Sequence, residues 1–157
     1  MESTTYIAES LDSGDWHVDV RIVGLDHLYL IEEMNALIFR EDRVINTFER
    51  EDLLILVAYV DGVPAGFKIG YKEDRFTFYS AKGGVRSEYR RRGVARILLQ
   101  HMCETVRSWG YRRLAYDTIP NRHAGMTVMG LAEGFRVTRA DYNPLYRDYR
   151  LRFERDL

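Results

Sequence analysis

A hairpin in the middle of the chain is the feature that most restricts the fold. Residues 53–60, LLILVAYV, form a continuous β-prone run, and the Asp61-Gly62 pair that follows is a tight-turn signal. Residues 63–71, VPAGFKIGY, supply the partner strand, and residues 75–85, RFTFYSAKGGV, supply a third strand after a short charged turn. We therefore expect three consecutive antiparallel strands at the centre of the fold.

The segment before this hairpin contains one strand and one helix. Residues 17–23, HVDVRIV, alternate between apolar and polar side chains, which predicts a half-buried strand. From Asp26 the apolar residues recur at helical spacing, and this helix should end near Phe39. The strongly charged residues 40–53 are interpreted as a loop, with a short helix as the alternative.

The segment after the hairpin returns to helical spacing. An amphipathic helix is predicted from Gly93 to Trp109, with Trp109 on its apolar stripe and Gly110 as its terminator. Alternation in the last strand predicts that Tyr149 faces the core. The remaining predicted elements are a strand at 113–119, a helix at 123–132, and a final pair of strands at 135–140 and 146–153 around residues 141–144.

Length and element order bound the architecture. A chain of 157 residues can bury most of its surface around one core, and the sequence contains no internal repeat, low-complexity tract or linker. We predict a single α+β domain over residues 1–157, built on a mixed, mostly antiparallel sheet of about six or seven strands flanked by helices.

Composition excludes several classes of protein. There are 23 basic and 24 acidic residues, so the chain lacks the broad basic excess of a general nucleic-acid binder. The first residues carry no basic n-region, and no segment approaches the roughly 18 apolar residues of a membrane span. The only cysteine, Cys103, rules out an internal disulfide and fits helix packing. We expect a cytoplasmic protein with no nucleic-acid partner, no membrane association and no metal site.

The stretch EYRRRGVARILL, residues 88–99, is the strongest functional signal. A strand, a short turn and a helix beginning near Gly93 would aim unpaired backbone N–H groups and the positive helix end at one point, which suits an anion such as phosphate. Gly93 would let a phosphate approach the backbone, and Arg90 and Arg92 could add charge-assisted hydrogen bonds. The stretch is neither a Walker A loop nor a dinucleotide fingerprint.

The segment from Val85 to Ala95, VRSEYRRRGVA, resembles the acyl-CoA signature of the GNAT superfamily of N-acyltransferases, Arg/Gln-x-x-Gly-x-Gly/Ala. Arg90, Gly93 and Ala95 occupy its key positions, and Ser87 stands where a proline is frequent. The predicted order of strands and helices also resembles this family over almost the whole chain. The segment from Asn121 to Gly134-Phe135 resembles the second part of the family core.

The resemblance implies acetyl-CoA as the cosubstrate. Its pyrophosphate would sit on the backbone amides of the turn, and its pantetheine arm would pair with the edge of the preceding strand. The residues that this implies for the cofactor site are Gly84, Val85, Arg86, Arg90, Arg91, Arg92, Gly93, Val94, Ala95 and Asn121.

The resemblance further implies transfer of the acetyl group to a primary amine of a small molecule, peptide or protein. An alkyl amine has a pKa of about 10.4, so nearly all of it is protonated at neutral pH. The site must therefore remove a proton from the amine or desolvate it. Many family members have a tyrosine four residues before the Gly-Phe pair, and it acts as the general acid that protonates the departing thiolate. This chain has Gly130 at that position. The catalytic residues stay open, with Tyr116, Asp117, His123 and Tyr146 as candidates. Because adjacent strand residues face opposite ways, at most one of Tyr116 and Asp117 can point into the cleft.

Two alternatives to an N-acetyltransferase stay open. Gly130 leaves room for a non-catalytic, acyl-CoA-binding regulatory protein on the same fold. The arginine run leaves room for a nucleic-acid-binding module, although no aromatic platform accompanies it. The tyrosine-rich final hairpin is also a possible homodimer contact in this family.

Overall fold

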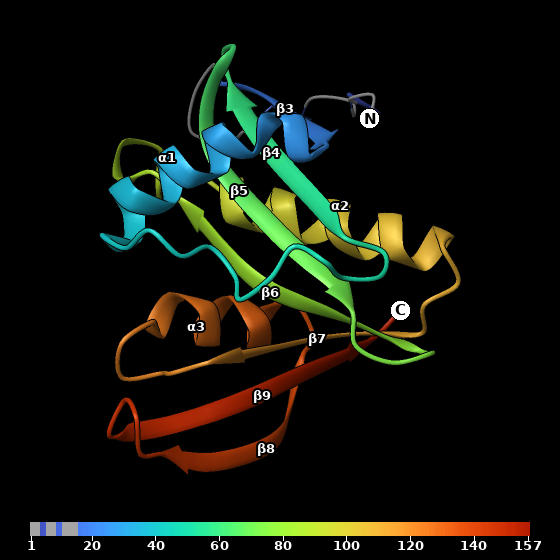
Figure 1. Ribbon diagram of the computed structural model, residues 1–157, viewed down its shortest axis with the longest axis vertical. Coiled ribbons are helices and arrows are strands. Elements are labelled where there is room, and N and C mark those ends of the chain that lie inside the picture. Colours follow the sequence, from blue (N-terminus) through green and yellow to red (C-terminus); the bar gives the residue numbers. More distant parts are fainter. Residues whose placement is uncertain (1–3, 6–8, 11–15) are drawn as a thin grey trace.

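A computed structural model describes residues 4–5, 9–10 and 16–157. Helix α1 lies against one face of a mixed β-sheet and helix α2 against the other, where α3 also packs through Met126 and Met129 (Figure 1). None of the helices in the described ranges is both long and apolar enough to cross a membrane. The helices are η1 (Leu25–His27), α1 (Leu28–Phe39), η2 (Ser87–Tyr89), α2 (Val94–Ser108) and α3 (Ala124–Ala132).

The main sheet has seven strands in the order β3-β4-β5-β6-β7-β9-β8, and two short strands, β1 and β2, both pair with β3. Every pairing is antiparallel except that of β6 with β7. The α+β fold class and the mostly antiparallel sheet predicted from the sequence are therefore confirmed. The strands are β1 (Thr4–Thr5), β2 (Glu9–Ser10), β3 (His17–Val23), β4 (Leu54–Val60), β5 (Val63–Lys72), β6 (Thr77–Val85), β7 (Arg113–Thr118), β8 (Arg136–Asn143) and β9 (Asp148–Asp156).

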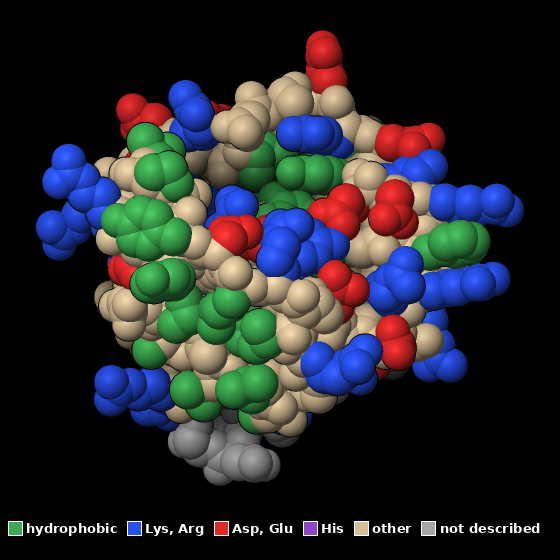
Figure 2. Space-filling model, turned by 90° about the horizontal axis from the view of Figure 1, so that it is seen from below, with side chains coloured by type: hydrophobic (Ala, Val, Ile, Leu, Met, Phe, Trp, Pro, Cys, Tyr) green, Lys and Arg blue, Asp and Glu red, His purple; other side chains and the backbone are tan. Residues whose placement is uncertain are grey.

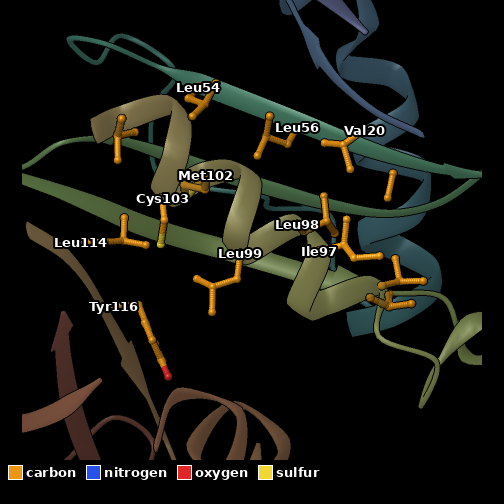
Figure 3. Close-up of a cluster of buried hydrophobic side chains, with 14 of the residues drawn as sticks. Val20, Leu54, Leu56, Ile97, Leu98, Leu99, Met102, Cys103, Leu114 and Tyr116 are labelled. Carbon is orange, nitrogen blue, oxygen red and sulfur yellow. The ribbon is translucent and has the colours of Figure 1, made fainter. Parts of the chain in front are cut away.

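The central position of β4 in the sheet explains why its sequence is continuously apolar. All seven of its residues are buried, because the sheet is covered on both faces. Leu54 and Leu56 pack in the cluster that contains α2, whereas Ile55 and Val57 pack in the cluster that contains α1. Figure 3 shows the first of these clusters, with Leu56 facing the apolar side of α2.

The predicted turn of the central hairpin is confirmed. Asp61 and Gly62 both have positive φ, of 48° and 82°. Two left-handed residues are what the tight turn of a twisted hairpin requires, and aspartate and glycine tolerate that conformation best. The hairpin therefore fixes the β4–β5 register that the rest of the sheet extends.

The parallel pair β6–β7 is short, and its ends diverge. Pairing is confined to Thr77–Tyr79 of β6 and Arg113–Ala115 of β7. Beyond it, β6 continues to Val85 bonded to β5, and β7 continues to Thr118 bonded to β9. The two strands separate from this point, which opens the sheet on the side where the turn before α2 lies.

Two predictions of buried side chains are wrong. Tyr149 is 59% exposed, because it lies on the part of β9 that extends beyond β7 and meets only Tyr142 of β8 across the strands. Trp109 is 45% exposed, because it caps the C-terminus of α2, where its ring touches the edge of Phe78. Alternation and helical spacing give the direction of a side chain but not whether a neighbour covers it.

The final hairpin also turns later than predicted. Residues 141–143 belong to β8, and β9 begins at Asp148. The turn is set by Asn143, whose Oδ1 accepts hydrogen bonds from the backbone N–H groups of Leu145 and Tyr146 at 2.9 and 3.2 Å. The sequence prediction centred the turn on residues 141–144, which is too early. The asparagine that forms the turn is at position 143, and the turn continues to residue 147.

Asn35 holds the loop that follows α1. It is fully buried, and its Nδ2 donates to the backbone oxygens of Glu41 at 2.8 Å and Arg43 at 3.2 Å. Since residues 40–53 form no helix or strand, these bonds replace the regular pairing that the loop lacks.

We expect Asn35→Ala to lower the free energy of unfolding by about 1–3 kcal/mol, because it removes two hydrogen bonds from carbonyls near the core. Urea denaturation measures the loss. Asn46→Ala is the matched control, since exposed Asn46 accepts only a bond from Arg43 in the same loop, and its effect should stay within about 0.5 kcal/mol. Equal losses in the two variants would contradict the anchoring role of Asn35.

Candidate functional site

A cavity of about 1090 Å³ occupies the opening between β6 and β7. Viewed from the β8–β9 side, the surface is hollowed between hydrophobic side chains, with acidic and basic side chains around the hollow (Figure 2). Helix α1 contributes Ile38 and Phe39, and the first turn of α2 closes one end. The cavity is therefore bounded by parts of the chain that are far apart in sequence.

The turn before α2 presents backbone N–H groups at this end of the cavity. Arg91 and Gly93 both adopt the left-handed conformation, with φ of 63° and 84°. Gly93 is the N-cap of α2 and no side chain caps the helix, so its first N–H groups have no intrahelical or capping partner. Left-handed residues beside the start of a helix form a concave set of N–H donors. These donors and the helix dipole both favour binding of an anion.

The arginines of the turn mainly brace it. Arg90 Nε donates to the carbonyl oxygen of Val85 at 2.8 Å, which ties the turn to the end of β6. The Arg86 guanidinium donates to the carbonyl of Pro64 at 3.3 Å and pairs with Glu88. The Arg92 guanidinium lies over the ring of Trp16, 4.4 Å from its centroid. An anion in the cavity would therefore be bound mainly by the backbone N–H groups of the turn. These arginines would contribute less, because they already contact other parts of the chain.

Most of the cofactor-site residues implied by the family resemblance line the cavity. Arg86 and Arg92 lie outside its lining, and Asn121 is also outside, with its Nδ2 bonded to Asp148 Oδ1 at 2.9 Å. The residues that do line it are Gly84, Val85, Arg90, Arg91, Gly93, Val94 and Ala95.

All four catalytic candidates line the cavity, but they differ in their surroundings. His123 begins α3 and its ring meets the edge of Phe39, at 6.4 Å between centroids. Tyr146 is half-exposed in the β8–β9 turn, where its carbonyl accepts a hydrogen bond from Arg122 at 2.8 Å. Both therefore sit toward the outer part of the cavity, between α3 and the final hairpin.

Tyr116 and Asp117 face opposite sides of β7, as the alternation of a strand requires. The Tyr116 ring stacks on Phe153, and its hydroxyl donates to the carbonyl oxygen of Met126 at 2.8 Å. Burial raises the pKa of Tyr116, so its proton is held firmly. Figure 3 shows the hydroxyl directed away from the core cluster, toward α3.

Gly130 is explained by this tyrosine. A Cβ at position 130 would overlap the Tyr116 hydroxyl oxygen and would come within 3.3 Å of the Phe153 ring. The Tyr116 hydroxyl therefore occupies the space that the first side-chain atom of residue 130 would need. The glycine that departs from the family pattern is a packing requirement of this chain.

Asp117 is the one carboxylate of β7 that reaches the cavity. Its Oδ2 accepts a hydrogen bond from the Tyr79 hydroxyl at 2.6 Å, while its Oδ1 is buried and has no hydrogen-bond partner among the described residues. Burial and the neighbouring carboxylate raise the pKa of Tyr79, which keeps the tyrosine a donor. An unsatisfied buried carboxylate oxygen favours a ligand that donates, such as an ammonium group.

Lys68 is a cavity residue that the sequence interpretation missed. It lies in β5, is only 4% exposed, and has no hydrogen bond or ion pair within the described part of the chain. Burial lowers its pKa to about 8. Lys82, by contrast, reaches the cavity from the other face of the sheet and is paired with Glu41 at 2.6 Å. The only sequence signal for Lys68 is a single charged residue inside an apolar strand.

The buried charge of Lys68 gives a stability prediction with a definite sign. Below pH 8 the lysine is protonated in both states, so folding bears the full cost of burying the charge. Between about pH 8 and 10.5 the unfolded chain binds more protons, and stability must rise with pH. A shift from 10.5 to about 8 corresponds to about 3 kcal/mol.

We therefore expect Lys68→Met to be more stable than the wild type by up to about 3 kcal/mol at pH 7. The difference should shrink as the pH rises from 8 to 10.5. Denaturant unfolding of the two proteins over this pH range measures it. A constant difference across the range would show that the buried lysine does not titrate as its surroundings require.

Comparison with known proteins identifies the fold. The sequence model of the acetyltransferase (GNAT) family matches residues 22–127. A search of curated proteins finds no significant match. Among solved structures, an IAA acetyltransferase from Bacillus cereus superposes with a TM-score of 0.77 at 19% identity, covering 89% of this chain and 99% of that one.

Two further structures share the fold. The ribosomal-protein-S18-alanine N-acetyltransferase from Escherichia coli has a TM-score of 0.76 at 16% identity, with 88% of this chain and 93% of that one covered. A GNAT family acetyltransferase from Elizabethkingia anophelis, solved with acetyl-CoA bound, has a TM-score of 0.67 at 14% identity, with 89% and 98% covered. Because the family match spans most of the chain, from β3 into α3, this protein belongs to the GNAT family of acetyl-CoA-dependent acetyltransferases.

Proposed function

We propose that the protein is an N-acetyltransferase that moves the acetyl group of acetyl-CoA to a primary amine of a small molecule, a peptide or a protein. The observation that carries this proposal is the buried, unpartnered Oδ1 of Asp117 in the opening between β6 and β7. An amine arriving as an ammonium group would satisfy that oxygen with a charge-assisted hydrogen bond.

The donor half of the site follows from the turn and from the edge of β6. The pyrophosphate of acetyl-CoA would bind the N–H groups between Arg91 and Ala95. Its pantetheine arm would lie along β6 from Val85 to Ser80, an edge of about 16 Å that β7 leaves unpaired. Both amides of the arm can bond backbone groups there, as an added strand does. The thioester would then lie near the bulge of β6 at Ala81, where its register with β5 shifts.

The acceptor half is on the α1 face of the same opening. The carboxylate of Asp117 would hold the ammonium group and accept a proton as the amine becomes nucleophilic. The neutral nitrogen attacks the thioester carbonyl, a C–N bond forms, and the C–S bond breaks. Of the two protons that the ammonium loses, one ends on the CoA thiol and the other on solvent. The Tyr79 hydroxyl fixes the orientation of the carboxylate by its hydrogen bond.

Thiolate protonation cannot use a tyrosine at position 130 in this chain. The Tyr116 hydroxyl is bonded to the Met126 carbonyl and its pKa is raised, so it is poorly placed to give up a proton. Tyr146 lines the outer part of the cavity and is 46% exposed. In our proposal the thiolate takes its proton from Tyr146 or from water in the cavity.

Asp117→Asn tests the acceptor half. We expect kcat/KM for the amine to fall by about 10²–10⁴-fold, because the amide cannot accept the proton, with acetyl-CoA affinity unchanged. Thiol release over a panel of polyamines, amino acids and peptides with free amino termini measures activity. Asp141→Asn, at a half-exposed aspartate of β8 that does not line the cavity, is the matched control. If Asp117→Asn and the control keep equal activity, Asp117 is not the amine-binding group. Acetyl-CoA binding without thiol release for any amine would support a non-catalytic acyl-CoA-binding protein instead.

Gly93→Ala tests the donor half. The methyl group would stand where the phosphate approaches the backbone, so we expect acetyl-CoA to bind at least about tenfold more weakly in calorimetry. Gly110→Ala is a close control, because Gly110 follows the other end of α2 with φ of 96° and open space around it. Each alanine bears a left-handed backbone cost of about 1–2 kcal/mol, but only Gly93→Ala should affect the ligand. Equal affinities in the two variants would place the pyrophosphate elsewhere.

A further inference from the structure

Lys68 lines the cavity from β5, on the α2 face of the sheet. Gly66 and Gly70, two residues to either side, approach Leu98 and Met102 of α2, whereas Phe67 and Ile69 pack in the cluster of α1. Alternation therefore places the lysine side chain on the α2 face, and it lines the cavity there. Asp117 lies on the opposite face, so the lysine is not part of the amine-binding group.

The ammonium group of Lys68 has no acceptor of its own. It makes no hydrogen bond or ion pair with the described residues, although Lys68 is only 4% exposed and lines the cavity. A buried cation without a partner is costly, and proteins normally pair it or let it bind a ligand. Because the group also lines a cavity, its missing partner can come from a bound molecule.

Glycine at position 83 directs this side chain toward β6. Lys68 and Gly83 are opposite each other in the β5–β6 ladder, and a Cβ on Gly83 would lie only 3.3 Å from Lys68 Cγ. The stem of the lysine side chain therefore lies close to β6 at Gly83, in the part of that strand that β7 leaves unpaired. Ser80, which is buried on the same strand, also lines the cavity.

This position corresponds to the acyl end of the donor, given the donor placement in the proposed function. The pyrophosphate turn follows Val85, and an arm that runs back along β6 reaches the segment between Gly83 and Ser80 last. An acetyl group ends in a methyl, which offers the ammonium nothing. An acyl chain that ends in a carboxylate would offer a charge-assisted hydrogen bond, about twice as strong as a neutral one.

We propose that Lys68 makes the enzyme accept, and prefer over acetyl-CoA, acyl-CoA donors whose acyl chain ends in a carboxylate, such as succinyl-CoA or malonyl-CoA. The inference rests on the donor site and the amine transfer of the proposed function, and it changes only which acyl group the enzyme prefers to transfer. The transfer step is unchanged: the amine nitrogen bonds to the thioester carbon, the C–S bond breaks, and CoA leaves as the thiol. The terminal carboxylate takes no part in the bond changes and stays paired with Lys68.

Calorimetric titration of the wild-type protein with succinyl-CoA, malonyl-CoA and acetyl-CoA tests the preference directly. We expect at least one of the two carboxylated donors to bind about tenfold or more tightly than acetyl-CoA. Lys68→Met should lose that preference while it still binds acetyl-CoA. Lys72→Met is the matched control, because Lys72 lies on the same strand outside the cavity and pairs with exposed Glu51 at 2.7 Å, and it should keep the preference.

The outcomes separate this inference from the proposed function. Binding of acetyl-CoA with no gain for either carboxylated donor would overturn the role of Lys68 and leave the acetyltransferase proposal standing. Failure of all three thioesters to bind would overturn both. The wild-type titration decides the point even if Lys68→Met does not fold. Where an acceptor amine is found, the mass of the product reports which acyl group was transferred from an equal mixture of donors.

Discussion

The early end of the β6–β7 pairing is the constraint on which the rest of the site depends. The two strands share only three residue pairs, after which each keeps a partner on one edge alone. A buried strand edge without partners is unfavourable, because its N–H and C=O groups lose water and gain no hydrogen bond. The opening is held because Arg90 ties the next turn to Val85, and because the Arg86 N–H bonds to the Ala65 carbonyl at 2.8 Å. A ligand with amides along its length would supply the hydrogen bonds that this edge of β6 lacks.

The two-residue period of the strands divides the chemistry between the faces of the sheet. On β7, Asp117 turns to the α1 face and Tyr116 to the α2 face; on β5, Lys68 turns to the α2 face. Opposite charges are thus kept apart by the backbone, although both reach one cavity. Lys68 and Asp117 therefore do not neutralise each other, and under our proposals each would attract a different part of the bound molecules.

Sequence reasoning predicted the framework because the signals for it are local. The Asp61-Gly62 turn, the helix that starts after Gly93 and the signature from Arg90 to Ala95 each depend on a few neighbouring residues. What could not be predicted depends on distant packing. Lys68 is buried on the side of α2, a helix that begins only at Val94. Nothing near Lys68 in the sequence indicates this burial. Tyr149 was misplaced for the converse reason, since alternation could not show that β7 ends before it.

The contact between Tyr116 and Gly130 restricts which sequences this fold can visit. No residue with a Cβ fits at position 130 while the hydroxyl of Tyr116 fills that space, and a smaller residue at position 116 would leave a hole beside Phe153 unless position 130 grew to fill it. Each substitution alone is unfavourable, and only the pair together is accessible. A single mutation therefore cannot place a tyrosine at position 130 of this chain, because the space is already filled by a side chain of the neighbouring strand.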